Sequence, residues 1–363
     1  MSVVSSTSPA YLVLEDGTVF EGFSMGCRGT AVGEIVFNTK TASYQDIMTD
    51  PTYYGQIVAQ TYPLVGNRGV QPESSSEIMA SGYIVREWCD EPTDARQNLT
   101  LDEYLKSRGI VGLCGIDTRR LTRMLRDGGY VKAAITDSLE DKDALLAKIR
   151  AYSIAGAVKA VTTKTVQQLP AADETAKMAV LDYGFNRNLV EFLQSRGISL
   201  TVFPADTAAE TITSGGFDGV MLSDGPGDPD EDMALIETIR TLTKSGLPIF
   251  AVGLGHQMLA HACGMRCGKM AHAHRSSNQP VRNLKTRKIM ITTQNHGYAV
   301  EKDSIDPAVA DAFLENVNDH TVEALRYKQF PALSVQFEPL DGPGLQDTAW
   351  VFDEVAAMLQ AGK

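Results

Sequence analysis

The chain has 363 residues, of which 43% are hydrophobic and 21% are charged, and its formal net charge is −12. That length favours two domains, and that composition is typical of a soluble globular protein. The acidic balance disfavours nucleic acid as the main partner, since phosphate binding needs a basic face. Apolar runs stay short of the roughly 20 residues of a membrane-spanning helix, and residues 1–17 do not resemble a signal peptide, so we expect a cytoplasmic protein without a membrane partner.

The first half, residues 1–161, is expected to form an α+β domain. Residues 10–26 predict a β-hairpin, because Asp16-Gly17 supplies the turn. This half contains no nucleophile elbow and no phosphate-binding loop in its sequence. Further strands are expected at GEIVFNT (33–39) and GQIVAQTYP (55–63), and helices at LTLDEYLKSRG (99–109) and DTRRLTRMLRDGG (117–129).

A linker and an α/β domain, residues 178–363, are expected to follow. The linker is TTKTVQQLPAADETAK (162–177), which is polar, contains Pro170 and has no clean period of 2 or 3.6. Beyond it, strands alternate with helices, which predicts a mostly parallel sheet flanked by helices. Later segments alternate more regularly and predict an antiparallel extension. The expected strands are 178–184, 199–205, 216–223 and 248–253, the helices are 188–197 and 232–246, and the extension comprises 288–300 and 320–337.

The segment PIFAVGLGHQMLAHACG, residues 248–264, predicts a strand, a tight turn and a helix that opens at His256. In α/β enzymes this arrangement presents a nucleophile, because the turn pushes one side chain out above the edge of the sheet. The side chain in question belongs to position 253, which is glycine. The pattern therefore predicts an elbow without a nucleophile.

Three glycine-containing loops are expected at the carboxyl ends of strands, where open α/β sheets bind ligands: SDGPGDP (223–229), GLGHQ (253–257) and QNHGY (294–298). Their backbone amides can approach a ligand closely and could form an oxyanion hole. Gln257 and Asn295 can donate and accept hydrogen bonds, as an amide ligand requires. Simpler interpretations are an ordinary turn at DGPGD, an incomplete nucleotide loop at Gly-Leu-Gly, and structural roles for His256 and His296.

The five cysteines are odd in number and scattered, which argues against a disulfide framework. Cys263 and Cys267 form a C-x3-C pair with His261, His272 and His274 nearby, so a zinc site is conceivable. The simpler interpretation is a small apolar residue at a helix end followed by a turn. We expect no metal site.

Distinctive motifs occur in both halves. The first half contains LVLEDGTVFEG, GEIVFNT, YQDIMTDPTYYGQIV, TYPLVGNRGV and GIDTRRLTRML, and the second contains SDGPGDP, GLGHQ and QNHGYAV. By these motifs the second half resembles class I glutamine amidotransferases, and the whole chain resembles the small subunit of carbamoyl phosphate synthase. The resemblance implies an amino-terminal α+β domain followed by a class I amidotransferase-like α/β domain.

In that family a cysteine at the elbow attacks the side-chain amide of glutamine, a histidine transfers protons and a glutamate orients the histidine. The family's elbow reads G-x-C-L-G-H-Q, which puts the cysteine at Gly253. Its Q-G-H-P-E segment corresponds to QFEPL (336–340), so Glu338 replaces the histidine and Leu340 the glutamate. The resemblance therefore implies that glutaminase activity is lost, and Phe337, which replaces a glycine, could also fill part of the pocket.

The family's glutamine-contacting positions are better preserved. Thr52 stands where the family commonly has serine, a change that retains the hydroxyl. The chain could therefore still bind glutamine although it no longer hydrolyses it. By resemblance these positions are Thr52, Gly225, Gly227, Leu254, Gln257, Asn295, Gly297 and Tyr298.

The resemblance also implies a partner, the large subunit, which makes carbamoyl phosphate from bicarbonate, ammonia and ATP for arginine and pyrimidine biosynthesis. ATP and magnesium would be used by that subunit, and no cofactor is expected in this chain. With its glutaminase lost, the chain would support an ammonia-dependent synthase. Two alternatives stay open: a pseudoenzyme that senses glutamine or another amide, and a subunit of a different ATP-dependent carbamoylating or amidating complex.

Overall fold

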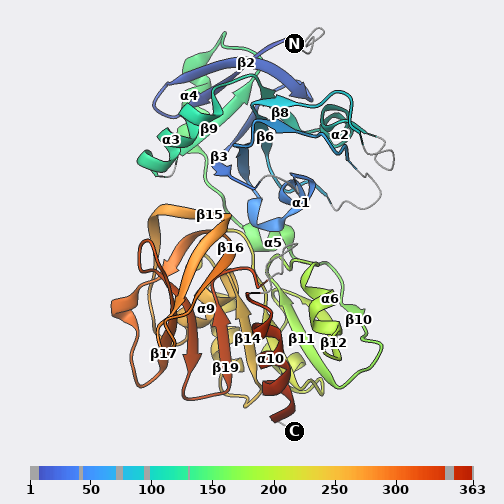
Figure 1. Cartoon of the computed structure of the whole chain (residues 1–363), viewed down its shortest axis with the longest axis vertical. Helices are drawn as coiled ribbons and strands as arrows, with labels where there is room; N and C mark the ends of the chain where they lie inside the picture. Colours follow the sequence, from blue (N-terminus) through green and yellow to red (C-terminus); the bar gives the residue numbers. More distant parts are fainter. Residues whose placement is uncertain are drawn as a thin grey trace. The chain divides into compact units, whose positions relative to one another are not determined.

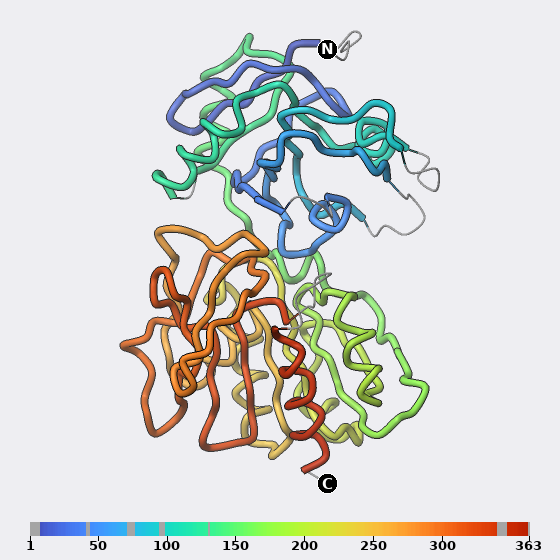
Figure 2. Tube along the Cα trace, in the orientation of Figure 1, coloured from blue at the N-terminus to red at the C-terminus, as the bar shows by residue number. Residues whose placement is uncertain are grey.

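The computed structural model describes residues 8–40, 44–70, 77–93, 99–129, 131–339 and 347–361. They belong to two compact units, Met1–Ala155 and Gly156–Lys363, which Figures 1 and 2 trace from blue to red. Within the described parts of the chain, we find no helix of the length and apolar character needed to cross a membrane.

The first unit is a closed barrel with the strand order β1-β2-β8-β6-β4-β3-β9. The expected hairpin is confirmed: Val13 pairs with Val19, and Gly17 turns the chain with a φ of +89°. Helix α2 begins where the Thr100 and Glu103 side chains form a capping box, which satisfies amides at the helix start. The barrel strands are β1 (Pro9–Leu14), β2 (Val19–Gly26), β3 (Ala31–Asn38), β4 (Gln56–Gln60), β6 (Gly82–Val85), β8 (Val111–Cys114) and β9 (Val131–Thr136).

Helices and a short ladder complete this unit. The apolar side chains of the barrel and of the helices are buried together, which gives the unit a core of its own. The ladder pairs β5 (Leu64–Val65) with β7 (Glu87–Trp88). The helices are α1 (Tyr44–Thr49), the 3-10 turn η1 (Pro51–Tyr53), α2 (Leu101–Ser107), α3 (Thr118–Gly128) and α4 (Lys142–Ala151).

The second unit is built on a ten-stranded sheet with the order β10-β12-β11-β13-β14-β19-β18-β17-β15-β16. Strands β12, β11, β13, β14 and β19 run parallel, which confirms the expected parallel sheet. The strands are β10 (Gln167–Leu169), β11 (Ala176–Asp182), β12 (Ile198–Pro204), β13 (Gly219–Leu222), β14 (Ile249–Val252), β15 (Cys267–Asn283), β16 (Ile289–Val300), β17 (Ala310–Asn316), β18 (Val322–Tyr327) and β19 (Ala332–Val335).

The antiparallel extension is confirmed for most of its length. Strands β15 to β18 pair antiparallel with their neighbours, and Figure 2 shows this orange part of the chain at the opposite end of the sheet from β10. Strand β19 was expected to belong to the extension. It instead pairs in parallel with β14, and so it joins the parallel and antiparallel parts of one sheet.

Helices cover both faces of this sheet, so strand residues are buried on alternate sides. Leu222 and Ala251 pack with α8 and α9, whereas Met221 and Val252 pack with α6 and α10. Figure 1 shows α9 behind the sheet and α10 in front of it. The helices are α5 (Ala157–Val161), α6 (Leu189–Gln194), α7 (Ala209–Thr213), α8 (Met233–Leu242), α9 (Leu254–Ala262) and α10 (Trp350–Ala361), with a 3-10 turn η3 (Lys302–Ser304).

The structure differs from the expected linker at residues 162–177. The two compact units divide between Ala155 and Gly156, before this segment. Gln167–Leu169 forms β10, which pairs antiparallel with β12 at the edge of the second sheet. The segment lacks a clear hydrophobic period because an edge strand of three residues buries too little to require one.

Candidate functional site

Three neighbouring parallel strands end at the candidate site. Leu222 of β13 pairs with Ala251 of β14, and Val252 of β14 pairs with Val335 of β19. The segments that follow these strands are 223–229, 253–257 and 336–338. Because the strands are parallel and adjacent, all three segments leave the sheet at the same edge, where open α/β sheets bind ligands.

The elbow predicted at residues 248–264 is present. Strand β14 ends at Val252, Gly253 has a φ of +54°, and α9 begins at Leu254. Gly255 is also required, because a Cβ at this position would lie 2.3 Å from the carbonyl oxygen of Leu222. The helix therefore packs directly on the end of β13, as a nucleophile elbow demands.

The side chain of Asp224 lies where a side chain at position 253 would project. A Cβ atom on Gly253 would be 2.0 Å from Asp224 Oδ1. The same oxygen accepts hydrogen bonds from the amide of Leu254 at 2.8 Å and from the amide of Gly225 at 2.7 Å. These are amides of the elbow and of the facing glycine loop, the pair expected to form an oxyanion hole. An internal carboxylate thus occupies both donors.

Asp224 was missed as a functional residue in the sequence. The available signal was its position beside Gly225, at the end of a predicted strand and facing an elbow that lacks a side chain. Sequence alone does not show that a carboxylate one residue before the glycine loop reaches across to the next strand. The contact depends on the pairing of β13 with β14.

The QNHGY segment is not a loop. Residues 294–298 lie inside β16, where Asn295 pairs with Arg275 and Tyr298 with Lys269 of β15. The alternation of buried and half-buried residues here is that of a strand in a long antiparallel ribbon, and not of a strand end followed by a loop. The segment still reaches the site, because the Tyr298 hydroxyl donates to Asp228 at 2.9 Å and its carbonyl accepts from Gln257.

The two expected amide side chains already have internal partners. Gln257 Nε2 donates to the carbonyl of Tyr298 and to Gln336 Oε1, both at 2.9 Å. The Asn295 Oδ1 atom accepts from Arg275. Both protons of the Gln257 amide are therefore used in tying α9 to β16 and to the segment after β19.

The remaining expected ligand positions are distributed over both units. Gly225 passes so close to the backbone that a Cβ would lie 2.0 Å from the Tyr183 carbonyl oxygen, and Gly227 has a φ of +105°. Leu254 is buried, and Gly297 is half-buried within β16. Thr52 belongs to the first unit, where its hydroxyl donates to Asp50 at 2.7 Å.

The histidines near the site are structural. Burial lowers the pKa of His256 to about 3, and its Nδ1 contacts Ser334 Oγ at 2.7 Å. His296 has partners at both ring nitrogens, and burial together with the nearby charge of His274 lowers its pKa well below the ordinary value. Both rings are therefore neutral at physiological pH, and their structural interpretation is supported.

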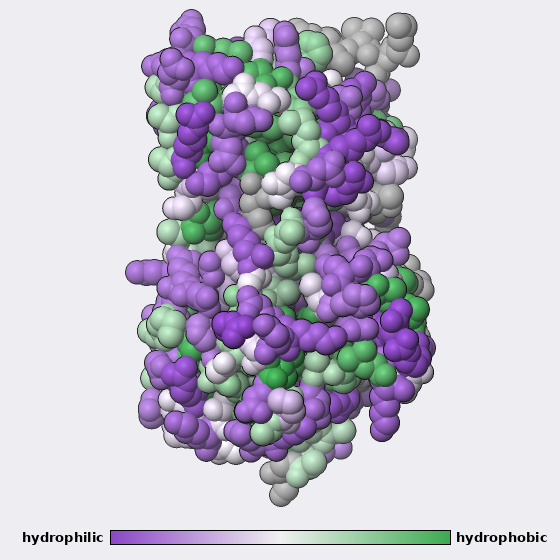
Figure 3. All heavy atoms as spheres, turned by 90° about the vertical axis from the view of Figure 1, so that its left-hand side faces the viewer, coloured by the Kyte–Doolittle hydropathy of each residue, from purple (hydrophilic) through white to green (hydrophobic). Residues whose placement is uncertain are grey.

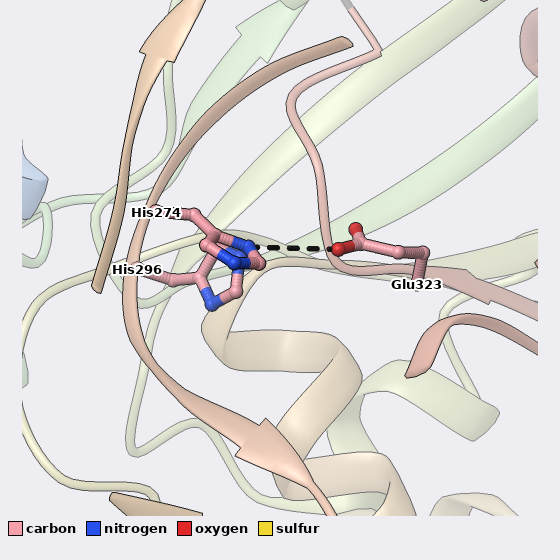
Figure 4. A group of neighbouring side chains, drawn as sticks. All are labelled: His274, His296 and Glu323. Atoms are coloured by element: carbon pink, nitrogen blue, oxygen red, sulfur yellow. Dashed lines mark ion pairs between the residues drawn. The ribbon is translucent and has the colours of Figure 1, made fainter. Parts of the chain in front are cut away.

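A buried cluster of His274, His296 and Glu323, drawn in Figure 4, lies where β15, β16 and β18 come together. Its ligand atoms lie within 4.8 Å of one another, a spacing that could hold a metal ion. Burial by itself lowers the pKa of His274, but hydrogen bonds with Asp319 and Glu323 raise it to about 9. His274 Nε2 lies 2.8 Å from Asp319, and its Nδ1 lies 3.7 Å from Glu323. A protonated His274 therefore pairs with both carboxylates.

The thiols suggested as a zinc pair do not have the character of reactive groups. Burial raises the pKa of Cys263 to about 12, and burial followed by neighbouring acidic groups does the same for Cys267. Both remain thiols at neutral pH, whereas nucleophiles and metal ligands must be thiolates. The Cys267 thiol instead faces the Gln257 carbonyl at 3.5 Å.

Two family models match the chain, one in each unit. Residues 12–135 match the family model "Carbamoyl-phosphate synthase small chain, CPSase domain", and residues 179–358 match "Glutamine amidotransferase class-I". The chain is 40% identical over 353 residues to the carbamoyl phosphate synthase small chain of Staphylococcus epidermidis and 42% identical over 352 residues to that of Bacillus caldolyticus. Each alignment covers 96% of both proteins.

This chain belongs to the carbamoyl phosphate synthase small chain family. Another carbamoyl phosphate synthase small chain, from Syntrophotalea carbinolica, is 41% identical over 372 residues, and the alignment covers 98% of each protein. The first unit contains the residues that match the small-chain domain, and the second unit contains those that match the class I amidotransferase domain.

Against the family's triad pattern, two of the three positions can be described. Position 253, where the family has its cysteine, is a glycine, so the elbow presents no side chain of its own. Glu338 is buried after β19, where its amide donates to the Thr293 carbonyl and its Oε1 has no hydrogen-bond partner among the described residues. Leu340 lies outside the described residues. Phe337, expected to fill part of the pocket, is fully buried in the apolar core on the α6 and α10 side of the sheet.

The crowding at the elbow predicts the effect of adding a side chain. Gly253→Cys should lower the melting temperature more than Gly264→Cys, a matched control that also has a positive φ but no heavy atom within 4 Å of its Cβ. Both variants place a side chain at a positive φ, which costs roughly 1–3 kcal/mol, and only the first displaces Asp224. Adding Asp224→Ala to Gly253→Cys should recover part of the loss. Equal losses in the two single variants would contradict this account.

The ion pairs of His274 predict a pH-dependent stability. Because the folded pKa of about 9 lies above the unfolded value near 6.5, the protonated imidazole stabilises the fold fully below pH 6.5, and this contribution is lost as pH rises through 9. The contribution amounts to about 3 kcal/mol. Denaturant unfolding of wild type and His274→Gln should therefore differ most at pH 6 and least at pH 9.5. His272→Gln, a variant of the exposed neighbouring histidine, is the control for the loss of one imidazole.

Proposed function

We propose that this chain is the small subunit of a carbamoyl phosphate synthase in which its own glutaminase is inactive. Its role is to support a large ATP-dependent subunit that uses free ammonia to make carbamoyl phosphate for arginine and pyrimidine biosynthesis. ATP and magnesium would be bound and used by the large subunit. The family membership of the full chain supports the choice of partner, since relatives that match over 96% of their length are named as small chains of that enzyme.

The observation that carries the proposal is the occupied elbow. Hydrolysis of glutamine in this family needs a thiolate at position 253 and two backbone amides that stabilise the developing oxyanion. Here position 253 is glycine, and Asp224 Oδ1 already accepts from the amides of Leu254 and Gly225. A negative carboxylate at this place would also repel an oxyanion. The site thus lacks both the nucleophile and an available electrostatic stabiliser.

No neighbouring residue in the described structure supplies a substitute. The thiols of Cys263 and Cys267 remain protonated because their pKa values are raised to about 12 by burial. His256 is a poor base at neutral pH because burial lowers its pKa to about 3. Removing the nucleophile or the base of such a triad costs roughly a million-fold in a serine protease, and here the pattern departs at all three positions.

A role as a glutamine sensor is less well supported. An amide ligand would compete with Tyr298 and Gln336 for the protons of Gln257, and with Asp224 for two backbone amides. Each hydrogen bond to a charged group that a ligand must replace is worth roughly 1.5–3 kcal/mol. A subunit of a different carbamoylating or amidating complex would share the same inactive site, and the identity of its partner separates that alternative from our proposal.

Activity assays with the reconstituted complex test the proposal. The chain and its cognate large subunit should co-elute in size-exclusion chromatography at micromolar concentration. The complex should make carbamoyl phosphate from ammonium, bicarbonate and ATP, with no glutamine-dependent synthesis above background. Gly253→Cys alone should not restore glutamine use, because Glu338 still replaces the histidine and Asp224 still occupies the amides.

Two results would overturn the proposal in different ways. Glutamine hydrolysis at a rate typical of the family, abolished by a substitution in this pocket, would show that the site is catalytic. Separate elution of the two proteins, with no ammonium-dependent synthesis from the mixture, would remove the subunit role while leaving the inactive site unaffected.

Calorimetric titration with glutamine distinguishes support from sensing. We expect wild type to bind glutamine in the millimolar range or weaker. Asp224→Ala should bind at least about tenfold more tightly, because it frees the amides of Leu254 and Gly225. Asp224→Asn is the matched control, since its side-chain oxygen can still accept from both amides, and it should remain a weak binder. Micromolar binding by wild type would favour the sensor.

A further inference from the structure

A pocket of about 630 Å³ lies in the first unit, on the side of the barrel that carries α3. It is formed by the segment after β4, the residue that follows β6, and α3 with its N-cap residue. Its lining is rich in guanidinium and hydroxyl groups and has one carboxylate. The lining residues are Thr61, Pro63, Arg86, Asp117, Thr118, Arg119, Thr122, Arg123 and Arg126.

Helix α3 is formed by the GIDTRRLTRML motif, one of the most distinctive in the sequence, and the proposed function gives this motif no role. Asp117 caps the helix by accepting from the amide of Arg120 at 2.9 Å. Leu121 and Leu125 are buried in the barrel core. Residues at i, i+4 and i+7 share one face of a helix, so Arg119, Arg123 and Arg126 project together on the outer side.

The fourth arginine comes from a different element and points into the same pocket. Arg86 follows β6, and its guanidinium donates to the Ile116 carbonyl at 3.1 Å, which holds it beside the start of α3. The amide of Gly115 in turn donates to the Arg86 carbonyl at 3.0 Å. The pocket is therefore built from three separate segments that converge, and not only from the exposed side of one helix.

The charges of the pocket do not cancel. Four guanidinium groups and one carboxylate, the helix cap Asp117, line the pocket, and Asp127, which is not part of the lining, pairs with Arg126. The local excess is two positive charges. Neither Arg119 nor Arg123 has an ion-pair partner among the residues that the structure describes.

This excess stands out because the whole chain carries a net charge of −12. In such a protein a concentrated positive site attracts anions locally against the overall field. Figure 3 views the molecule from the side on which α3 lies in Figure 1, and hydrophilic side chains are frequent over the first unit there. The arginines are exposed and thus available to a ligand from solution.

We propose that this pocket binds the phosphate group of a small phosphorylated metabolite of about nucleotide size. Guanidinium groups bind phosphate oxygens in pairs, and a phosphate monoester carries a charge near −2 at neutral pH, which matches the excess of two positive charges. The hydroxyl of Thr61 adds a neutral donor, whereas the Thr122 hydroxyl already donates to the Thr118 carbonyl at 2.7 Å. A volume of about 630 Å³ lies within the range of small-molecule sites.

Calorimetry on the full chain at low ionic strength tests the proposal, with AMP, inorganic phosphate and adenosine as probes. AMP should bind with a submillimolar Kd, phosphate more weakly, and adenosine not measurably. The double variant Arg119→Ala with Arg123→Ala should weaken AMP binding at least tenfold, and Arg123→Lys, which keeps the charge but loses the paired donors, should have an intermediate effect.

The matched control is Arg187→Ala with Lys244→Ala, which removes two positive charges from the second unit. It should leave the AMP affinity within about twofold of wild type, and circular dichroism should show that all variants keep their fold. Absence of AMP and phosphate binding, or equal loss in the control and the pocket variant, would overturn the proposal. It would also be overturned if the pocket variant weakened only binding of the large subunit, since the arginines would then serve a protein interface.

Discussion

The direct packing of α9 on the end of β13 is the constraint on which the second unit's site depends. It requires a positive φ at Gly253 and no side chain at Gly255, whose Cβ would lie 2.3 Å from a carbonyl oxygen of the neighbouring strand. A helix that starts so close to the sheet directs its first amides toward the adjacent loop. Those amides need acceptors, because buried unpaired amides are costly.

In this protein the acceptor comes from the chain itself. Asp224 enters the space that a side chain on Gly253 would take and bonds to amides from two different segments. The two amides that an amidotransferase would direct at a transient oxyanion are hydrogen-bonded here to an internal carboxylate. Under the proposed function the scaffold is kept without its chemistry, since this contact satisfies the donors that catalysis would leave open between turnovers.

Two further polar networks hold this part of the fold. Gln257 links α9 to β16 and to Gln336 after β19. The charged His274 joins β15 to the acidic groups of Asp319 and Glu323, the second of which is fully buried. A buried carboxylate needs a partner of opposite charge, which explains why this histidine keeps its proton. Side chains of types common in catalytic and metal sites thus serve here to fix strands relative to one another.

The sequence by itself determined the family, the hairpin of the first unit, the parallel sheet of the second, and the missing side chain at the elbow. These follow from local patterns: Asp16-Gly17 makes a turn, hydrophobic runs alternate with amphipathic helices, and position 253 is read directly. The loop predicted at residues 294–298 was wrong, because these residues lie within β16. A long antiparallel ribbon and a strand followed by a loop show the same alternation of hydrophobic and polar residues. It could not show what fills the empty elbow. That depended on strand pairing, which places Asp224 at the end of β13 within hydrogen-bonding reach of Leu254, thirty positions away in the chain. Such contacts are decided only by tertiary structure, since no local period or propensity encodes which loop ends will lie side by side.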